Sequence, residues 1–412
     1  MHKSPPFYLY FNPNHDVKQL ENPYLVNDSW EYGNSIIKWN HQVREFMLKD
    51  VKISVRQFTV LVIIYTIGTT ILLIPSGLAA DAKQDAWLAA ILGVVLNLLV
   101  VCLYNRVSDS FPDMTLVQYN EKVFGKWLGK LLSLFFILFS FVGATTVLFD
   151  LGNFINTQVM PDTPIQAINI IYALVVVMGV RLGLETLIRA AEIFFPWIIM
   201  LFIILVLCLL PEVRIEKLQP MFTTGVKPLI KGALSVAGTA SLPFIVLFMV
   251  FPAHVNQYRK AKKAFLIATL LGGVFFVIIT FLCISVLGVQ MTERHMYPSY
   301  ALAKQISIGN FLERVEILIA GIWFLTVYYK TTIYFYGFVI GLAQFLNMAN
   351  YRPLVLPLGM ILVVYSLVVY PNVAYLAEFD NKIWVPYALT MGLLYPVLIL
   401  GVAAIRKSLT KN

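Results

Sequence analysis

Charged residues are scarce in this chain. Asp, Glu, Lys and Arg make up 13% of its 412 residues, whereas a typical soluble domain carries about 25%. Apolar residues make up 59%, which is above the roughly 45–50% of soluble domains. The composition therefore excludes a soluble domain and predicts an integral membrane protein.

Motifs of catalysis and metal binding are also missing. The chain contains no phosphate-binding G-x-x-x-x-G-K-[ST] loop, no H-E-x-x-H zinc motif and no G-x-S-x-G nucleophile turn. Its three cysteines, Cys102, Cys208 and Cys283, lie in apolar runs without a C-x-x-C pair or a nearby histidine, so we expect them to be packing residues. We therefore expect no enzyme activity, no cofactor and no metal site.

Long apolar runs are what the chain has in abundance. A run of about 20 residues is long enough to cross a hydrocarbon core of about 30 Å. We predict ten spans, at residues 55–80, 86–107, 127–152, 165–181, 184–210, 226–255, 261–288, 313–347, 354–370 and 384–406. Ten spans place both termini on one side of the membrane. The loops on that side carry twice as many Lys and Arg residues as the other loops. This bias predicts cytoplasmic termini, and it explains the net charge of +9 without a nucleic-acid partner.

The first 50 residues differ from the rest. They are polar with scattered aromatic residues, follow neither a helical nor a strand period, and lack the apolar segment of a secretory signal. We expect residues 1–50 to be a polar cytoplasmic extension without a folded core. Residues 51–412 would then form the membrane domain.

Two spans interrupt their own helices. Span one reads "YTIGTTILLIPSG" near its middle, at residues 65–77, and span six reads "SVAGTASLPF" at residues 235–244. Backbone groups freed in lipid need internal partners, so a broken span must shelter or use them. Pro75 and Pro243 fall where each second half-helix would restart. Paired breaks in the first helix of each half predict an inverted five-plus-five repeat, with halves at about 55–210 and 226–406.

Two stretches carry a family resemblance. One is "KISVRQFTVLVIIYTIGTTILLIPSGL", from Lys52, and the other is "YPSYALAKQISIGNFLERVEILIAGIWFLTVYYKTTIYFYGF", from Tyr297 to Phe338. From about Lys52 to its C-terminus the chain resembles the B subunit of GerA-type spore germination receptors, within the amino acid–polyamine–organocation permease superfamily. The resemblance implies an all-α, leucine-transporter-like fold that binds a small, amino-acid-like germinant. It also implies action with an A subunit and a lipoprotein C subunit in the spore inner membrane.

The two helix breaks are the predicted ligand site. The N-terminal end of the restarted first helix suits a carboxylate, and the free carbonyls at the break in span six suit an ammonium, so an amino acid fits both. We expect the ligand, rather than folding, to require Gly68. Many amino-acid permeases have a second glycine where this chain has Thr70, whose Cβ narrows the approach. The expected ligand-binding residues at the breaks are Gly68, Thr69, Thr70, Ser235, Gly238, Thr239 and Ser241.

Spans three and eight are expected to supply the wall of this site. Val142, Gly143 and Thr146 share one helical face of span three. Ordinary helix packing through Gly143 explains the same pattern, and both interpretations remain open. On span eight, Tyr329, Thr332 and Tyr336 form a similar stripe, and we expect Tyr329 to contact the ligand.

Lys330 is the most informative single residue. It lies near the middle of span eight, where a lysine costs about 2.5–3.5 kcal/mol even on lenient scales, so it needs partners. We expect carbonyls near Ile64–Gly68 and the Glu192 carboxylate to be those partners, although Glu192 also fits a cytoplasmic charge ladder with Arg189. Asp150, near the outer end of span three, is expected to reach solvent. In transporters of this fold a sodium ion bridges the first and eighth helices, and by that resemblance we expect the Lys330 ammonium to replace it.

Two functions share this fold. One is germinant recognition in a spore germination receptor, and the other is proton-coupled amino-acid symport. A third alternative is a scaffold that binds no solute. The resemblance favours germinant recognition.

Overall fold

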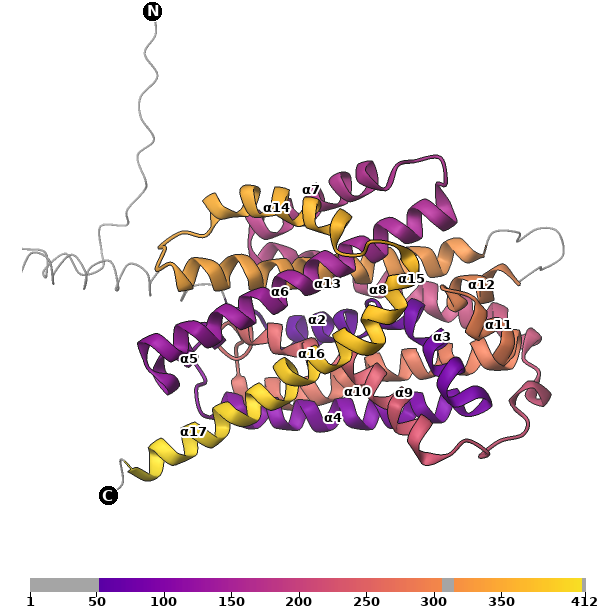
Figure 1. Ribbon diagram of the computed structural model, residues 1–412, viewed down its shortest axis with the longest axis horizontal. Helices are drawn as coiled ribbons and strands as arrows, with labels where there is room; N and C mark the ends of the chain where they lie inside the picture. Colours follow the sequence, from indigo (N-terminus) through magenta and orange to yellow (C-terminus); the bar gives the residue numbers. More distant parts are fainter. Residues whose placement is uncertain (1–51, 306–314, 410–412) are drawn as a thin grey trace, which may run out of the picture. The chain divides into compact units, whose positions relative to one another are not determined.

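The structure, a computed structural model, describes residues 52–305 and 315–409. The predicted extension and part of the "YPSYALAKQISIGNFLERV" stretch lie outside these ranges. Within them the chain is helical, apart from loops and one isolated bridge between Ile53 and Val255. The longer helices are α2 (Val55–Ile67), α3 (Thr70–Ala82), α4 (Ala86–Asp109), α6 (Lys126–Phe154), α7 (Ile165–Leu182), α8 (Leu184–Leu209), α9 (Val226–Ala240), α10 (Tyr258–Leu282), α13 (Glu316–Phe345), α14 (Arg352–Val368) and α17 (Tyr395–Leu409) (Figure 1). The shorter helices are α5 (Leu116–Phe124), α11 (Val289–Arg294), α12 (Pro298–Lys304), α15 (Val373–Phe379) and α16 (Val385–Leu389).

These helices account for all ten predicted spans. Among the described residues, eight helical stretches are long and apolar enough to cross a membrane, and Val55–Ile67 and Arg352–Val368 are shorter apolar helices. The largest error concerns the last span, which we placed at 384–406. Helix begins instead at Val373 and continues through α15, α16 and α17, joined by π-helical turns at Asp380–Trp384 and Thr390–Leu394. The polar residues before Trp384 suggested a loop, but one of them, Asp380, faces the interior of the bundle.

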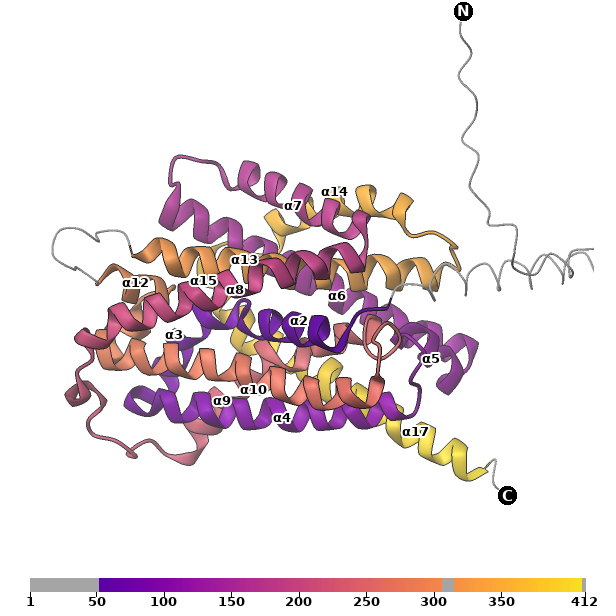
Figure 2. The same ribbon diagram turned by 180° about the vertical axis from the view of Figure 1, so that it is seen from behind.

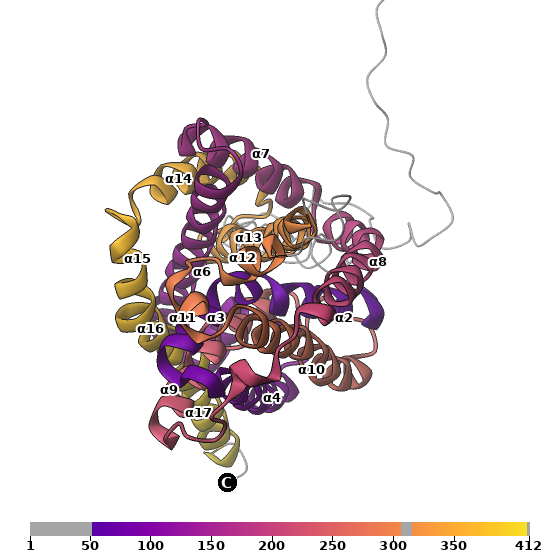
Figure 3. The same cartoon turned by 90° about the vertical axis from the view of Figure 1, so that its right-hand side faces the viewer.

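α3 and α13 lie near the middle of the bundle, and α7, α8 and α14 lie outside them (Figure 3). α6 and α13 run side by side (Figure 1), and α4 and α10 form a second adjacent pair (Figure 2). Glycines allow such close approach: a Cβ added to Gly272 of α10 would lie 2.6 Å from Thr66 of α2. Gly143 of α6 likewise faces the ring of Tyr334 on α13, so a side chain there would collide with it.

The break in span one lies where it was predicted. α2 ends at Ile67, Gly68 has φ 15° and ψ −123°, and α3 starts afresh at Thr70. A capping box at the other end of α2, between Ser54 and Gln57, fixes where this half-helix begins. The turn is short, because only Gly68 and Thr69 leave the helix.

The break in span six is equally short. α9 ends at Ala240, and the chain continues from Leu242 to Met249 as a 3₁₀ helix rather than the expected α-helix. Pro243 occupies its second position, as predicted for a restart.

Three carbonyls around this second break accept hydrogen bonds from side chains elsewhere in the bundle. The Gly238 and Thr239 carbonyls accept from Trp384 Nε1 (3.1 Å) and Lys330 Nζ (2.8 Å). Tyr104 Oη donates to the Leu242 carbonyl at 2.8 Å. The broken backbone is therefore satisfied inside the protein, as lipid surroundings require.

The prediction for Pro75 is wrong. The proline lies inside α3 rather than at its start, so it leaves the Ile71 carbonyl without the usual i→i−4 donor. The hydroxyl of Ser299, on α12, donates to that carbonyl at 2.5 Å. Ser299, far along the chain, thus supplies the hydrogen-bond donor that the Ile71 carbonyl lacks because of Pro75.

The bond from Ser299 to the Ile71 carbonyl predicts that mutations of Ser299 and Pro75 have non-additive effects on stability. Ser299→Ala should destabilise the protein by about 1–3 kcal/mol, because the buried Ile71 carbonyl loses its donor. In a Pro75→Ala background the backbone N–H of residue 75 can bond Ile71, so the same change should cost much less. Thermal unfolding of the purified wild type and the three variants measures the cycle. Equal costs of Ser299→Ala in both backgrounds would contradict this role of Ser299.

Candidate functional site

A small interior cavity lies where the two breaks meet α6 and α13. Its volume is about 40 Å³, which is room for a few water-sized groups. The lining residues are Thr69, Leu73 and Ile74 from the first break and α3, Thr146, Val147 and Asp150 from α6, Thr239 from α9, Lys330 and Tyr334 from α13, Tyr370 after α14, and Asp380 and Trp384 before α16.

Lys330 joins the two breaks. Its ammonium donates to Thr69 Oγ1 and to the Thr239 carbonyl, each at 2.8 Å, and lies 5.3 Å from the centroid of the Tyr65 ring. The side chain is 1% exposed. Hydrogen bonds to a charged donor and a cation–π contact are what an ammonium needs so far from water. Lys330 therefore ties α13 to the start of α3 and to the last turn of α9.

The predicted partners of Lys330 were partly wrong. Its partner in span one is the hydroxyl of Thr69, not a carbonyl near Ile64–Gly68. Glu192 lies elsewhere: it accepts from Gln57 Nε2 at 2.9 Å and pairs with Arg56 at 3.6 Å, where α8 meets the start of α2. The sequence suggested Glu192 because it is an acidic residue inside span five, about two turns from the end of that span.

Gly68 is needed by Lys330. A Cβ on Gly68 would lie 2.6 Å from Cδ of Lys330 and 2.8 Å from the Tyr65 carbonyl oxygen. This contact favours a structural role for Gly68, whereas we expected that the ligand, rather than folding, requires it. The lysine stem fills the space that the missing side chain leaves.

Two carboxylates face the same cavity as the ammonium. Asp150 of α6 is 8% exposed, so the expectation that it reaches solvent is wrong. It lies close enough to Lys330 and Asp380 to interact electrostatically with both. Asp380 was missed because it was read as part of a loop, although its i,i+4 spacing to Trp384 places both on one helical face.

Thr69, Thr146, Thr239 and Lys330 are the predicted site residues that line the cavity. Others lie beside it or in the helix packing. Thr70 and Ser241 have buried hydroxyls without a partner in the described structure, and Ser235 accepts from Thr239 Oγ1. Val142 is half-buried. Gly143 packs against Tyr334, in agreement with the interpretation that span three packs against a neighbouring helix through this glycine.

The face that we predicted on span eight does not line this cavity. Tyr329 is fully buried and contacts the Tyr328 ring, and Tyr336 contacts Tyr351, so neither lines the cavity. Lys330 and Tyr334, four residues apart, form the lining face instead. Because one residue turns a helix by about 100°, a stripe based on Tyr329 could not also present Lys330 to the same site.

One oxygen at each break is already engaged by Lys330. The Thr69 hydroxyl at the first break and the Thr239 carbonyl at the second both accept from its ammonium. Among residues 52–305 and 315–409, no three His, Cys, Asp or Glu side chains gather as a metal site would require. The geometry thus does not fit a sodium ion between these two oxygens.

Comparison with known proteins identifies the family. The model of the family described as "Spore germination protein" matches residues 52–373. The chain belongs to this family. Spore germination protein KB of Bacillus subtilis (strain 168) is 29% identical over 366 residues, which are 87% of this chain and 96% of that protein. Spore germination protein GerLB of Bacillus cereus is 27% identical, over 71% of this chain and 79% of that relative.

Solved structures identify the fold of this spore germination protein. MhsT in complex with L-phenylalanine has a TM-score of 0.64 at 14% identity, covering 85% of this chain and 98% of that one. Mhp1, a nucleobase-cation-symport-1 family transporter, has a TM-score of 0.61 at 12% identity, covering 82% and 76%. The predictions of a leucine-transporter-like helical membrane fold, of a spore germination protein and of a non-enzyme are confirmed.

The contact between Gly68 and Lys330 can be tested with two alanines. Gly68→Ala should lower the stability of the protein by about 1–3 kcal/mol, because the new methyl group overlaps the lysine stem. Gly77→Ala, in the same span, is the matched control, since nothing lies within 4 Å of its added Cβ. It should be neutral or stabilising by about 0.5–1 kcal/mol. Thermal unfolding in detergent compares them, and equal midpoints would refute the contact.

Proposed function

We propose that this spore germination protein recognises a small, amino-acid-like germinant in the cavity between its two helix breaks. One observation carries the proposal: the cavity is lined by one ammonium, Lys330, and by two carboxylates, Asp150 and Asp380. An α-amino acid is a zwitterion, and these groups complement both of its charges. Fixed charges inside a membrane protein are costly and mark functional sites.

The proposed assignment of charges follows from which groups are already engaged. The Thr239 carbonyl, which we expected to hold the ligand's ammonium, accepts from Lys330. The ligand's ammonium therefore falls to Asp150 or Asp380. Its carboxylate falls to Lys330 and the N-terminal end of α3, where helix N–H groups favour an anion.

Size adds a second feature to the proposal. The cavity has room for only a few water-sized groups, fewer than the non-hydrogen atoms of an amino acid, so we infer that binding separates its walls. Those walls include Thr69 at the first break, Thr239 at the second and Trp384 before α16. A ligand that widens the cavity moves the helices that Lys330 holds together, and this movement would be the first step of the signal.

The wider setting is part of the proposal. The family relationship supports action with an A subunit and a lipoprotein C subunit in the spore inner membrane. The distribution of Lys and Arg supports cytoplasmic termini, with residues 1–50 as a cytoplasmic extension of the domain 51–412.

Proton-coupled amino-acid symport is the second candidate function. It is favoured by the fold shared with Mhp1, a transporter, and by the burial of Lys330 and Asp150. Uptake of labelled amino acids into proteoliposomes discriminates between the two. Germinant recognition predicts binding without concentrative uptake under an imposed pH gradient, and robust accumulation would identify a symporter.

Loss of the cavity's ammonium should abolish the response. Lys330→Met keeps the length of the side chain and removes its charge, and Lys330→Arg should not rescue, because the guanidinium is larger and planar. Spores carrying either variant should fail to germinate on amino acids that trigger the wild type, and the wild type should respond equally in sodium-free medium. Lys227→Met, an exposed lysine at the start of α9, is the control and should respond normally. Normal germination of Lys330→Met spores, with the protein present in the membrane, would refute the assignment.

A further inference from the structure

A second, larger pocket lies where the C-terminal end of α4 meets the N-terminal end of α10. It has a volume of about 600 Å³ and is lined from α4 by Asn105 and Asp109, and from α10 by Tyr258, Arg259, Lys262 and Lys263, among others. None of its residues lines the germinant cavity. We call it the basic cleft.

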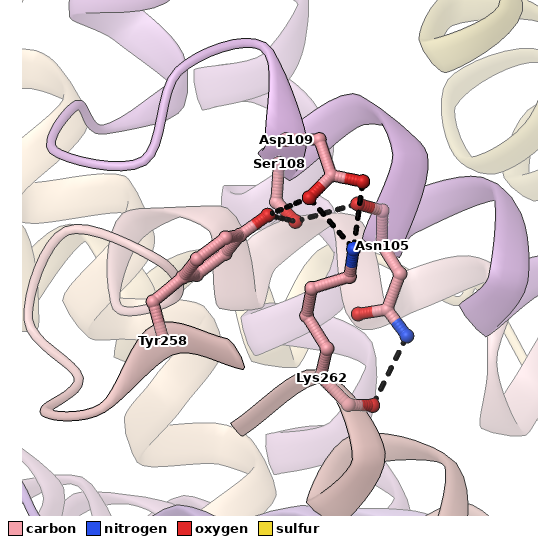
Figure 4. A network of polar contacts seen from close by, with 5 residues as sticks. All are labelled: Asn105, Ser108, Asp109, Tyr258 and Lys262. Carbon is pink, nitrogen blue, oxygen red and sulfur yellow. Dashed lines mark hydrogen bonds and ion pairs between the residues drawn. The ribbon is translucent and has the colours of Figure 1, made fainter. Parts of the chain in front are cut away.

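One acidic side chain, Asp109, is the centre of a network of polar contacts in the basic cleft (Figure 4). Lys262 Nζ donates to both carboxylate oxygens of Asp109 at 2.6 Å, and Tyr258 Oη donates to Oδ1 at 2.6 Å. Asn105 Nδ2 donates to the Lys262 carbonyl at 3.1 Å. These bonds link α4 to α10, and the ion pair with Lys262 balances the negative charge of Asp109.

The remaining charge of the cleft is positive. Three basic side chains against one carboxylate leave a formal excess of two positive charges. Arg259 and Lys263 are exposed, and within residues 52–305 and 315–409 neither side chain makes an ion pair or a hydrogen bond. α10 also begins here, at Tyr258, with no side chain capping its N-terminus and no acidic residue in its first turn. Each of these features favours an anion.

An apolar surface continues from the cleft along both helices. Leu266 lines the cleft. Beyond it, exposed apolar residues follow at helical spacing, and they are Ile267, Leu270, Leu271 and Val274 on α10 and Leu92, Val95 and Leu99 on α4. A ligand that fits the whole surface has an anionic head and an apolar tail.

We propose that the basic cleft binds the phosphate headgroup of an anionic phospholipid, whose acyl chains lie along α4 and α10. The charge of Arg259 and Lys263 holds the headgroup, and Asp109 keeps Lys262 in place beside it. Basic pockets between membrane helices bind lipid headgroups in this way. The apolar surface favours a lipid over free phosphate, because free phosphate has no apolar part to pack against it.

The experiment compares lipids on the purified full-length chain. Affinity for phosphatidylglycerol and for phosphatidylcholine is measured in mixed micelles by displacement of a fluorescent lipid. The wild type should prefer phosphatidylglycerol at least about 10-fold, and the variant Arg259→Gln/Lys263→Gln should lose about 10–30-fold in affinity for it, since each basic residue near an anionic lipid contributes about one kcal/mol, or about fivefold. Lys126→Gln/Arg181→Gln, which also removes two exposed basic charges, is the matched control and should keep the preference.

Three results would overturn the proposal. Equal binding of both lipids by the wild type would show that the protein does not recognise the charge of the headgroup. An equal loss in the control variant would assign the preference to overall charge rather than to the cleft. Displacement of phosphatidylglycerol by inorganic phosphate or glycerol 3-phosphate at low millimolar concentration would make the cleft a site for free phosphates. Because both double variants change exposed side chains, their unfolding midpoints in phosphatidylcholine should match the wild type.

Discussion

A charged amine in the middle of a membrane protein has to be hydrogen-bonded, and much of this site follows from that requirement. Lys330 meets it by donating to a hydroxyl at one helix break and to a carbonyl at the other. Each break in turn needs partners for groups that have left the helix. The lysine and the breaks thus satisfy each other, and Gly68 is the residue that leaves room for the lysine stem.

The bonding of Lys330 to both breaks explains how one small cavity can recognise a zwitterion. The ammonium is fixed by the protein itself, so the carboxylates of Asp150 and Asp380 can complement a second positive charge, that of the ligand. The cavity is tight, so any ligand large enough to engage both sets of charges must move the helices that Lys330 links. Recognition and conformational change then share one set of contacts, as differential binding to two states requires.

Much of the fold could be predicted from sequence, because helix length and apolar runs are local properties. Both breaks were found from Gly and Pro in apolar runs, and Lys330 was found from its cost in lipid. The partners of Lys330 were not, because they depend on how helices rotate about their axes. The cavity is lined by Lys330 and Tyr334, a face that starts one position after Tyr329. Asp380 was missed because the polar residues around it suggested a loop. Ser299, which repairs the gap at Pro75, is equally non-local.

The Lys330–Thr69 bond holds α13 to the first break. A double-mutant cycle of Thr69→Val and Lys330→Met, followed by unfolding of the four purified proteins, measures that bond most directly. The account predicts a coupling free energy of about 1.5–3 kcal/mol, as for a hydrogen bond with a charged partner, so that Thr69→Val is costly only while Lys330 is present. Costs that add to within about 0.5 kcal/mol would contradict it.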